Sequence, residues 1–520
     1  MRFRRLFLLG IVASSLLVVV RPSAADVRLP AMFTDHAVLQ RDMPVPVWGW
    51  ADAGEKVTVK IGKQTKTATA DAQTGKWTVK LDPLSVGGPL TLTVSGKNKI
   101  EVTDILVGEV WICSGQSNMQ FAVNGVRGSK EEIAAANYPK IRLISVPQKG
   151  SATPADDFSG HWAPCSPDTV RGFSAAGYFF GRDLFKNLNV PIGLIHCSFG
   201  GSSCESWVNR PALEAVPQLK AMLERYDQQL ATYSEESAKA TFDKQLAKWK
   251  KDAAAAKKAG KKAPNRPRGP SDPRTNNQFP ANLYNAMLHP VLPYALRGAI
   301  WYQGETNAGR AYQYRTLFPA MIRAWRAEWQ EGDFPFYFVQ LANFMDTKPE
   351  PADSMWAELR EAQSMTLKLP CTGQAVIIDI GEAHDIHPKN KQDVGKRLAL
   401  WALAKTYGKN VVYSGPTYKS LAIQGNKAVV SLDNVGGGLV AKGGSELKGF
   451  AVAGSDKKFV WADARIEGDK IVVSSPQVEK PVAVRYAWAE NPICNLYNKA
   501  DLPASPFRSD DWPGITAGKE

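Results

Sequence analysis

The sequence predicts an α/β protein in which a central parallel sheet, covered by helices, lies between two smaller β domains. Between about residues 105 and 408, continuous apolar runs such as IGLIHCS and AVIIDI alternate with helical stretches. Strands that are apolar on both faces are typical of a parallel sheet with helices on both sides. On either side, at 26–104 and 409–520, apolar and polar residues alternate, which is typical of antiparallel β-sandwich domains.

The first 25 residues have the three parts of a secretory signal peptide. A basic start is followed by an apolar middle and by small residues that end near Ala24 and Ala25. An uncleaved membrane anchor is the alternative interpretation. No later stretch is long and apolar enough to span a bilayer. We therefore expect a periplasmic or secreted protein with no integral membrane span after signal cleavage.

The formal net charge of +14 is concentrated in two segments. Residues 1–25 carry four arginines and no acids, and residues 244–274 carry eleven Lys and Arg against two Asp, so together they supply +13. The rest of the chain is nearly neutral, which argues against a nucleic-acid partner. The basic segment ends a charged helical stretch at about 209–275 that interrupts the α/β pattern. We expect an insertion with a flexible, solvated end.

Cysteine and histidine patterns argue against a metal or other cofactor. The chain has six cysteines, too few for a disulfide scaffold, and their pairing is open. Neither a CxxC nor an HExxH motif is present.

Four polar clusters each follow an apolar run that is predicted to be a strand. They are GQSNM (115–119), SFGGSS (198–203), QGETN (303–307) and HDIHP (384–388). In an open α/β sheet, ligands bind at the carboxyl ends of the strands. The four clusters are therefore expected to converge on one crevice.

Ser117 is a candidate nucleophile, although a serine after a strand is more often a helix cap and no GxSxG elbow is present. A nucleophilic serine needs a base within hydrogen-bond reach and donors for the oxyanion. His387 stands at a strand end and is the predicted base, oriented by Asp385 in the chain order Ser, Asp, His. The predicted oxyanion donors are the Ser117 N–H, a Gly200 or Gly201 N–H, and the Asn307 side chain.

Together these clusters resemble the sequence blocks of the SGNH hydrolases, and more closely the sialate O-acetylesterases, a branch that includes acetylxylan esterases. The resemblance covers about 105–408 and implies an SGNH, flavodoxin-like sheet in a serine esterase that removes O-acetyl groups from carbohydrates. Ser117, one glycine of 200–201, Gly304 with Asn307, and His387 match the family blocks. The family aspartate stands three residues before the histidine, whereas position 384 here is histidine. Asp385 is the predicted third member of the triad, and a backbone carbonyl is the alternative.

The resemblance implies an acetylated carbohydrate substrate and leaves the sugar open among sialic acid, xylan, and pectic or other glycans. Arg310 and Arg508 are candidates for binding a sialate carboxylate. Three further residues of the clusters are predicted either to orient the leaving sugar or to brace the loops: Gln116, Gln303 and Glu305.

Three other interpretations compete with the esterase. His384, Asp385 and His387 could form part of a metal site, but no nearby cluster supplies more ligands. Glu305 could be the acid of a glycosidase, which usually needs a second carboxylate. The candidates for that second carboxylate are Asp379, Glu382 and Glu205. The third interpretation is a secreted carbohydrate-binding protein without activity.

Overall fold

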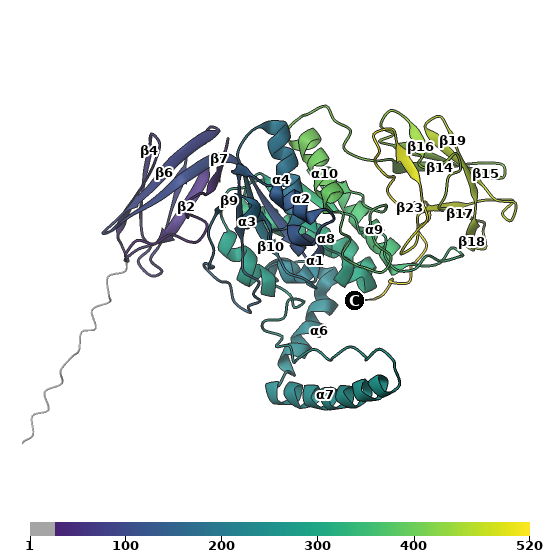
Figure 1. Cartoon of the computed structure of the whole chain (residues 1–520), viewed down its shortest axis with the longest axis horizontal. Helices are drawn as coiled ribbons and strands as arrows, with labels where there is room; N and C mark the ends of the chain where they lie inside the picture. The colour runs from purple at the N-terminus through teal and green to yellow at the C-terminus, as the bar shows by residue number, and fades with distance from the viewer. Residues whose placement is uncertain (1–25, 520) are drawn as a thin grey trace, which may run out of the picture.

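The structure is a computed structural model that describes residues 26–519, so the predicted signal peptide lies outside the described residues. Three parts follow one another along the long axis: strands of the N-terminal part, a central body of strands and helices, and strands of the C-terminal part (Figure 1). Within the described range, no helix combines the length and hydropathy needed to cross a membrane. The fold is therefore α/β at its centre with additional β-sheet regions at both ends.

The central sheet has the strand order β13-β12-β11-β7-β10-β8-β9, and every neighbouring pair is parallel except β8 and β9. Its strands are β7 (Lys99–Gly115), β8 (Tyr138–Ser145), β9 (Ala163–Cys165), β10 (Ile192–Ser198), β11 (Gly298–Tyr302), β12 (Phe336–Val339) and β13 (Thr372–Ala375). Numbered along the chain, the six parallel strands lie in the order 2-3-1-4-5-6 from β8 to β13, as in an open parallel α/β sheet. The strand order reverses between β7 and β11, where such sheets bind ligands.

β7 is a 17-residue strand that belongs to both the N-terminal part and the central body. Its first half pairs antiparallel with β6 (Gly87–Ser95), and its second half pairs parallel with β10 and β11. The whole sheet is therefore mixed. The boundary that we predict at residue 104 lies inside β7, and one hydrophobic cluster extends from the N-terminal part into the central body.

The other N-terminal strands extend this sheet or pair beside it. β1 (Val38–Gln40) pairs parallel with β7, β3 (Lys56–Ile61) joins β4 (Gln64–Thr69) to β6, and β2 (Val45–Trp50) pairs with β5 (Lys76–Leu81). In β3 and β5 every second residue is buried, as the sequence alternation predicts.

Helices cover both faces of the central sheet. On one face, α4 (Ala175–Leu188) and α10 (Lys391–Trp401) pack side by side, and Trp111 of β7 meets Phe180 with ring centroids 5.0 Å apart. On the other face, Trp301 of β11 meets Trp325 of α8 (Ala311–Trp329) at 5.8 Å, and α9 (Met355–Met365) packs beside α8. Aromatic side chains thus fill the layers between sheet and helices. The shorter helices of the body are α1 (Ser117–Gln120), α2 (Ser129–Ala134) and α3 (Pro167–Val170).

The helical insertion is only partly separate from the body. Buried Leu213 of α5 (Arg210–Glu214) and buried Met222 of α6 (Lys220–Ala231) pack against the main core. By contrast, α7 (Glu235–Lys258) has no buried residue and lies away from the body in Figure 1. The basic residues of 244–274 are therefore on an exposed helix and the segment that follows it.

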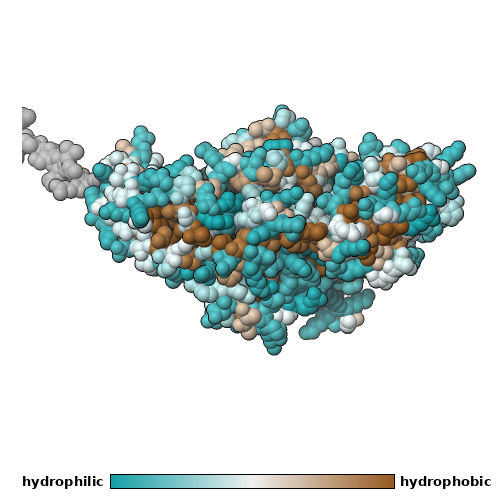
Figure 2. Space-filling model, turned by 90° about the horizontal axis from the view of Figure 1, so that it is seen from above, coloured by the Kyte–Doolittle hydropathy of each residue, from teal (hydrophilic) through white to brown (hydrophobic). Residues whose placement is uncertain are grey.

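The C-terminal part has a hydrophobic core of its own. Its two four-stranded sheets consist of β14 (Thr417–Gln424), β15 (Lys427–Asp433), β20 (Lys470–Ser474) and β19 (Asp463–Glu467), and of β18 (Phe459–Trp461), β17 (Phe450–Ala453), β21 (Ala483–Tyr486) and β23 (Phe507–Arg508). β16 (Leu439–Ala441) and β22 (Leu496–Asn498) form a separate pair. On the face shown in Figure 2, the hydrophilic surface is interrupted by apolar patches at both ends and in the centre. All six cysteines are free, and four of them are buried.

Candidate active site

β7 and β11 come very close together at the point where the strand order reverses. Ser117 follows directly after this point. β7 ends at Gly115, whose φ of 138° lies in the region that favours glycine. A Cβ at Gly115 would come within 2.2 Å of the Tyr302 carbonyl oxygen, so only glycine fits there. α1 begins at Ser117, after an N-cap residue, Gln116, that makes no side-chain cap. Ser117 is therefore not a helix cap.

The structure brings Ser117 and His387 into hydrogen-bond contact, with Ser117 Oγ 2.9 Å from His387 Nε2. Asp385 lies beside them, but its Oδ1 is 3.6 Å from His387 Nδ1, longer than a hydrogen bond of normal strength. The same oxygen accepts the backbone N–H of His387 at 2.9 Å. Asp385 thus acts on the imidazole ring mainly through its charge in this geometry, and its role as third triad member stays a prediction.

The surroundings of His387 keep its imidazole neutral near neutral pH. Partial burial lowers the pKa of His387, the charge of Asp385 opposes this, and the charge of Lys391 lowers the pKa further. A general base must be neutral to accept a proton. The electrostatics therefore suit a base that works from mildly acidic pH upward.

We expect the acid limb of kcat/KM for 4-nitrophenyl acetate to have its midpoint below pH 6.5, because only neutral His387 can accept the serine proton. In Asp385→Asn, the loss of a negative charge lowers the pKa of His387, so the limb should move to still lower pH. The check is a pH–rate profile of both proteins. A midpoint that stays in place or rises in the variant would contradict the electrostatic role of Asp385.

Of the two candidate glycines, Gly200 lies next to the serine. A Cβ built on Gly200 would be 3.4 Å from Ser117 Cβ, whereas the nearest atom to one on Gly201 is Asn277 Nδ2 at 3.9 Å. The Gly200 N–H donates to Gln120 Oε1 at 2.8 Å. The Gln120 side chain thus accepts a hydrogen bond from the Gly200 N–H, which we predict to bind the oxyanion. Gln120 must turn away before this N–H can bind an oxyanion.

Asn307 is fixed by a buried network that the sequence does not reveal. Its Oδ1 accepts the Cys204 N–H at 3.0 Å, and its Nδ2 donates one hydrogen bond, to Glu205 Oε2 at 3.0 Å. Glu205 is fully buried and pairs with Arg310 at 2.6 Å. Burial would raise the pKa of Glu205, but the Arg310 guanidinium and its hydrogen bonds hold it below the usual value. Asn307 is therefore rigidly placed, with one amide hydrogen not used by Glu205.

The two arginine candidates are both held by carboxylates. Arg310 pairs with Glu205 in the network that holds Asn307. Arg508 lies in the C-terminal part and pairs with Glu361 at 2.6 Å and with buried Asp510. Neither guanidinium is free to take a sialate carboxylate without giving up part of an ion pair.

Gln116 and Gln303 are both buried, and their amides bond to the surrounding loops. Gln116 Oε1 accepts the Gly304 N–H at 3.2 Å. Gln303 Nε2 donates to Asn307 Oδ1 at 2.7 Å, and Gln303 Oε1 accepts the Tyr314 hydroxyl at 2.9 Å. Of the two roles predicted for these glutamines, the contacts favour bracing of the loops.

A second buried network holds the histidine loop, and sequence reasoning missed it. Asn118 Nδ2 donates to Glu305 Oε1 at 2.7 Å and to the Ile386 carbonyl at 2.9 Å. Lys391 Nζ donates to Asn118 Oδ1 at 2.6 Å and to the Pro388 carbonyl at 2.8 Å. We call Asn118, Glu305 and Lys391 the histidine clamp, because they fix the carbonyl groups on both sides of His387. The only sequence signal was the position of Asn118 beside Ser117.

Two of the three side chains of the clamp have a shifted pKa. Lys391 is fully buried, and this burial lowers its pKa to about 7. Burial also raises the pKa of Glu305, whose Oε2 is buried without a hydrogen-bond partner among the described residues. Perturbed groups of this kind gather at functional sites.

The carboxylates needed for a glycosidase are engaged elsewhere. Asp379 accepts two hydrogen bonds from Arg397, at 2.5 and 2.8 Å, and Glu205 belongs to the Asn307 network. Glu382 accepts the backbone N–H of Lys389 at 2.9 Å. No observation in the structure favours a pair built on Glu305.

The histidines of the HDIHP cluster point to different places. His384 is exposed and lies 3.8 Å from Asp346, whereas His387 contacts Ser117. Between residues 26 and 519, no three His, Cys, Asp or Glu side chains come together as metal ligands would. The geometry therefore gives the metal interpretation no support.

Comparison with known proteins identifies the family. The model of a family described as carbohydrate esterase, sialic acid-specific acetylesterase, matches residues 107–242 and 274–403. The gap covers most of α7 and the basic segment after it. Sialate O-acetylesterase of Rattus norvegicus is 31% identical, covering 94% of this chain and 95% of its own length. The human enzyme of that name is 29% identical, with 97% of each chain covered.

A solved structure agrees with these relatives. It is described as a novel carbohydrate acetylesterase from Xanthomonas citri and superposes with a TM-score of 0.79 at 40% identity. The match covers 94% of this chain and all of the other. These findings confirm the resemblance that the four polar clusters carry. The chain is a carboxylic ester hydrolase and belongs to the carbohydrate esterase family of sialic acid-specific acetylesterases.

Proposed function

We propose that this protein is a serine esterase that removes O-acetyl groups from sialic acids, with Ser117 as nucleophile and His387 as general base. The observation that carries the proposal is the 2.9 Å contact between Ser117 Oγ and His387 Nε2 at the reversal of the strand order. We assign the central body to the SGNH type, flanked by β-sandwich-like domains at 26–104 and 409–520. The signal-peptide pattern at 1–25 supports a periplasmic or secreted location.

The proposed reaction has two halves. His387 Nε2 takes the proton of Ser117, whose Oγ attacks the acetyl carbonyl carbon, and the negative oxygen binds the oxyanion donors. The sugar alcohol leaves with the proton held by His387. Water then attacks the acetyl-serine, His387 again moves the proton, and acetate leaves. Asp385 stabilises the imidazolium that forms in each half.

The proposed oxyanion donors are the N–H groups of Ser117 and Gly200 or Gly201, and the Asn307 amide. For Asn307→Ala we expect kcat to fall about 100- to 1000-fold with little change in KM, because one donor is lost only where charge develops. Steady-state kinetics on 4-nitrophenyl acetate measure this. Near wild-type turnover would remove Asn307 from the oxyanion hole.

The sugar preference rests on the relatives, which are named sialate O-acetylesterases, and on the family description. Acetate release should be compared between 9-O-acetylated sialic acid and acetylated xylan. Faster release from the sialic acid supports the proposal. Faster release from xylan would instead make the protein a polysaccharide acetylesterase with the same chemistry.

A further inference from the structure

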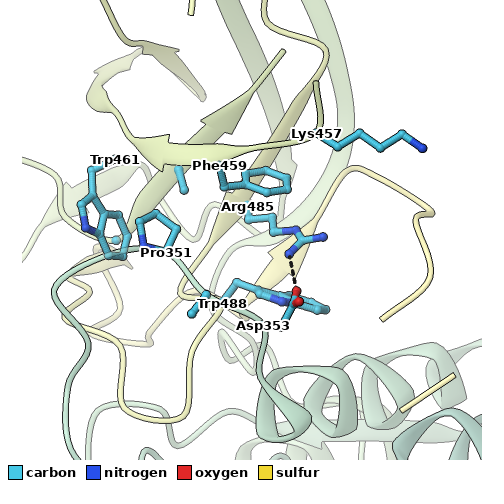
Figure 3. Close-up of a pocket in the computed structure, with 10 residues that line it drawn as sticks. Pro351, Asp353, Lys457, Phe459, Trp461, Arg485 and Trp488 are labelled. Atoms are coloured by element: carbon cyan, nitrogen blue, oxygen red, sulfur yellow. Dashed lines mark ion pairs between the residues drawn. The ribbon is translucent and has the colours of Figure 1, made fainter. Parts of the chain in front are cut away.

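A polar and aromatic pocket lies between the C-terminal part and the segment before α9 (Figure 3), and no residue of the Ser117 site lines it. The pocket is open to solvent and has a volume of about 590 Å³. It is formed by the segment that precedes α9 and by the strands β17, β18 and β21. The residues that matter here are Trp461, Trp488, Phe459, Arg485 and Asp353, and we call their site the Trp461 pocket. None of them takes part in the proposed reaction.

The Trp461 ring is exposed and held in place. The residue is 41% exposed, and its indole N–H donates to the Pro349 carbonyl at 2.6 Å. The hydrogen bond fixes the N–H edge of the indole, while part of the apolar ring surface stays exposed to solvent. An immobile, exposed indole is suited to packing against the C–H face of a flat ligand, with little entropy left to lose.

Charged groups lie beside the aromatic rings. Arg485 is nearly buried and is fixed by two hydrogen bonds to Asp510, at 2.9 and 3.0 Å. Its Nη1 is 3.8 Å from the exposed Asp353 carboxylate, and Figure 3 shows this pair next to Trp488. Asp510 takes Nε and Nη2 of Arg485, so Nη1 is the nitrogen that offers donors, while Asp353 offers acceptors, as the hydroxyl groups of a sugar ring require. A few fixed polar groups among aromatic rings are typical of a small-ligand site.

One chain segment borders both this pocket and the proposed active site. Asn343 Oδ1 accepts the Gly381 N–H at 2.7 Å, and the Met345 N–H donates to the Ala383 carbonyl at 2.9 Å, close to the loop that carries His387. The same segment reaches the pocket at Asp353, eight positions after Met345. Eight residues span at most about 28 Å. A contact across the two parts links the sites more directly: Asn343 Nδ2 donates to Asn491 Oδ1 at 2.9 Å, and Asn491 lies three positions after Trp488 of the pocket.

We propose that the Trp461 pocket binds a sugar ring of the substrate glycan that does not carry the reacting ester. This inference rests on the proposed function, because it assumes that an acetylated glycan is bound at Ser117. One ring packs on Trp461 and bonds to Arg485 and Asp353, while the acetylated ring lies at Ser117. The enzyme then prefers an oligosaccharide to the free acetylated monosaccharide.

The test compares Trp461→Ala with the wild-type enzyme on matched substrates: 9-O-acetylated sialyllactose against 9-O-acetylated sialic acid, and acetylated xylo-oligosaccharides against acetylated xylose. We expect KM for the better oligosaccharide to rise about tenfold, the effect of losing roughly 1.4 kcal/mol of stacking. KM for the monosaccharide and kcat/KM for 4-nitrophenyl acetate should not change. Trp461→Tyr, which keeps an aromatic face, should recover most of the affinity.

Trp249→Ala is the matched control. Its indole N–H also donates to a proline carbonyl, that of Pro264 at 2.8 Å, but it lies on the projecting helix α7. This control should behave as wild type on every substrate. An unchanged oligosaccharide KM in Trp461→Ala, or no preference for the oligosaccharide in the wild type, overturns the proposal. Loss of 4-nitrophenyl acetate hydrolysis in Trp461→Ala would instead reveal a structural role. If the proposed function itself is wrong, the wild-type enzyme is inactive on all of the acetylated substrates, which distinguishes that failure from failure of the pocket proposal.

Discussion

Ser117→Ala is expected to lose all measurable esterase activity, a fall of at least about 10⁴-fold in kcat. Without the hydroxyl no acetyl-enzyme forms, and only the oxyanion donors and substrate binding remain to assist direct attack by water. The measurement is acetate release from 9-O-acetylated sialic acid and cleavage of 4-nitrophenyl acetate. Because Ser117 is half-buried and its hydroxyl forms one hydrogen bond, to His387, the fold should be unaffected.

Ser114→Ala is a matched control on the same strand. The Ser114 hydroxyl is buried and has no hydrogen-bond partner among residues 26–519, so its loss should leave activity nearly unchanged. The same pair of variants distinguishes the serine esterase from a glycosidase and from a binding protein without activity. A glycosidase would keep most of its activity in Ser117→Ala, and a binding protein would be inactive in all forms. Substantial ester cleavage by Ser117→Ala would contradict the assigned nucleophile.

Lys391→Met is expected to lower kcat by about 100-fold and the free energy of unfolding by about 2–6 kcal/mol. The variant leaves Asn118 Oδ1 and the Pro388 carbonyl without their buried donor, at about 1–3 kcal/mol each. With Pro388 released, His387 shifts relative to Ser117, and misplacement by about 1 Å can cost about 100-fold in rate. Steady-state kinetics and urea unfolding measure the two effects.

The pH profile of Lys391→Met gives a readout that a structural defect alone would not produce. The charge of Lys391 lowers the pKa of His387, so its removal should move the acid limb of kcat/KM to higher pH, opposite to Asp385→Asn. Lys389→Met is the control, since Lys389 is exposed and its ammonium lies 3.9 Å from Glu382. Such a surface pair contributes little to stability. Wild-type kcat in Lys391→Met would show that the histidine clamp does not position His387.

The α/β class of the central body and the meeting of Ser117 with His387 were accessible from sequence because both leave local patterns. Apolar runs followed by polar clusters mark strand ends, and parallel strands bring those ends to one edge of the sheet. The continuity of β7 was not accessible. Its change from antiparallel to parallel pairing depends on β6, β10 and β11, and the last two lie far along the chain.

The histidine clamp and the Asn307 network were missed for a related reason. Asn118 and Lys391 are 273 residues apart, and Asn307 and Glu205 are 102 apart. Hydrogen bonds between buried side chains at such separations produce no periodicity and no motif. For Gln116 and Gln303, the sequence placed the residues in the right loops but did not distinguish contact with sugar from contact with backbone, because that depends on burial.

The most direct test of the central claim is covalent trapping of the nucleophile. The purified protein is treated with a 4-nitrophenyl alkylphosphonate, and the modified peptide is located by mass spectrometry in the wild type and in His387→Ala. We expect one adduct, on Ser117, together with loss of activity, and much slower labelling without the His387 base. An inactivated enzyme whose adduct is on another residue, or equally fast labelling in His387→Ala, would contradict it.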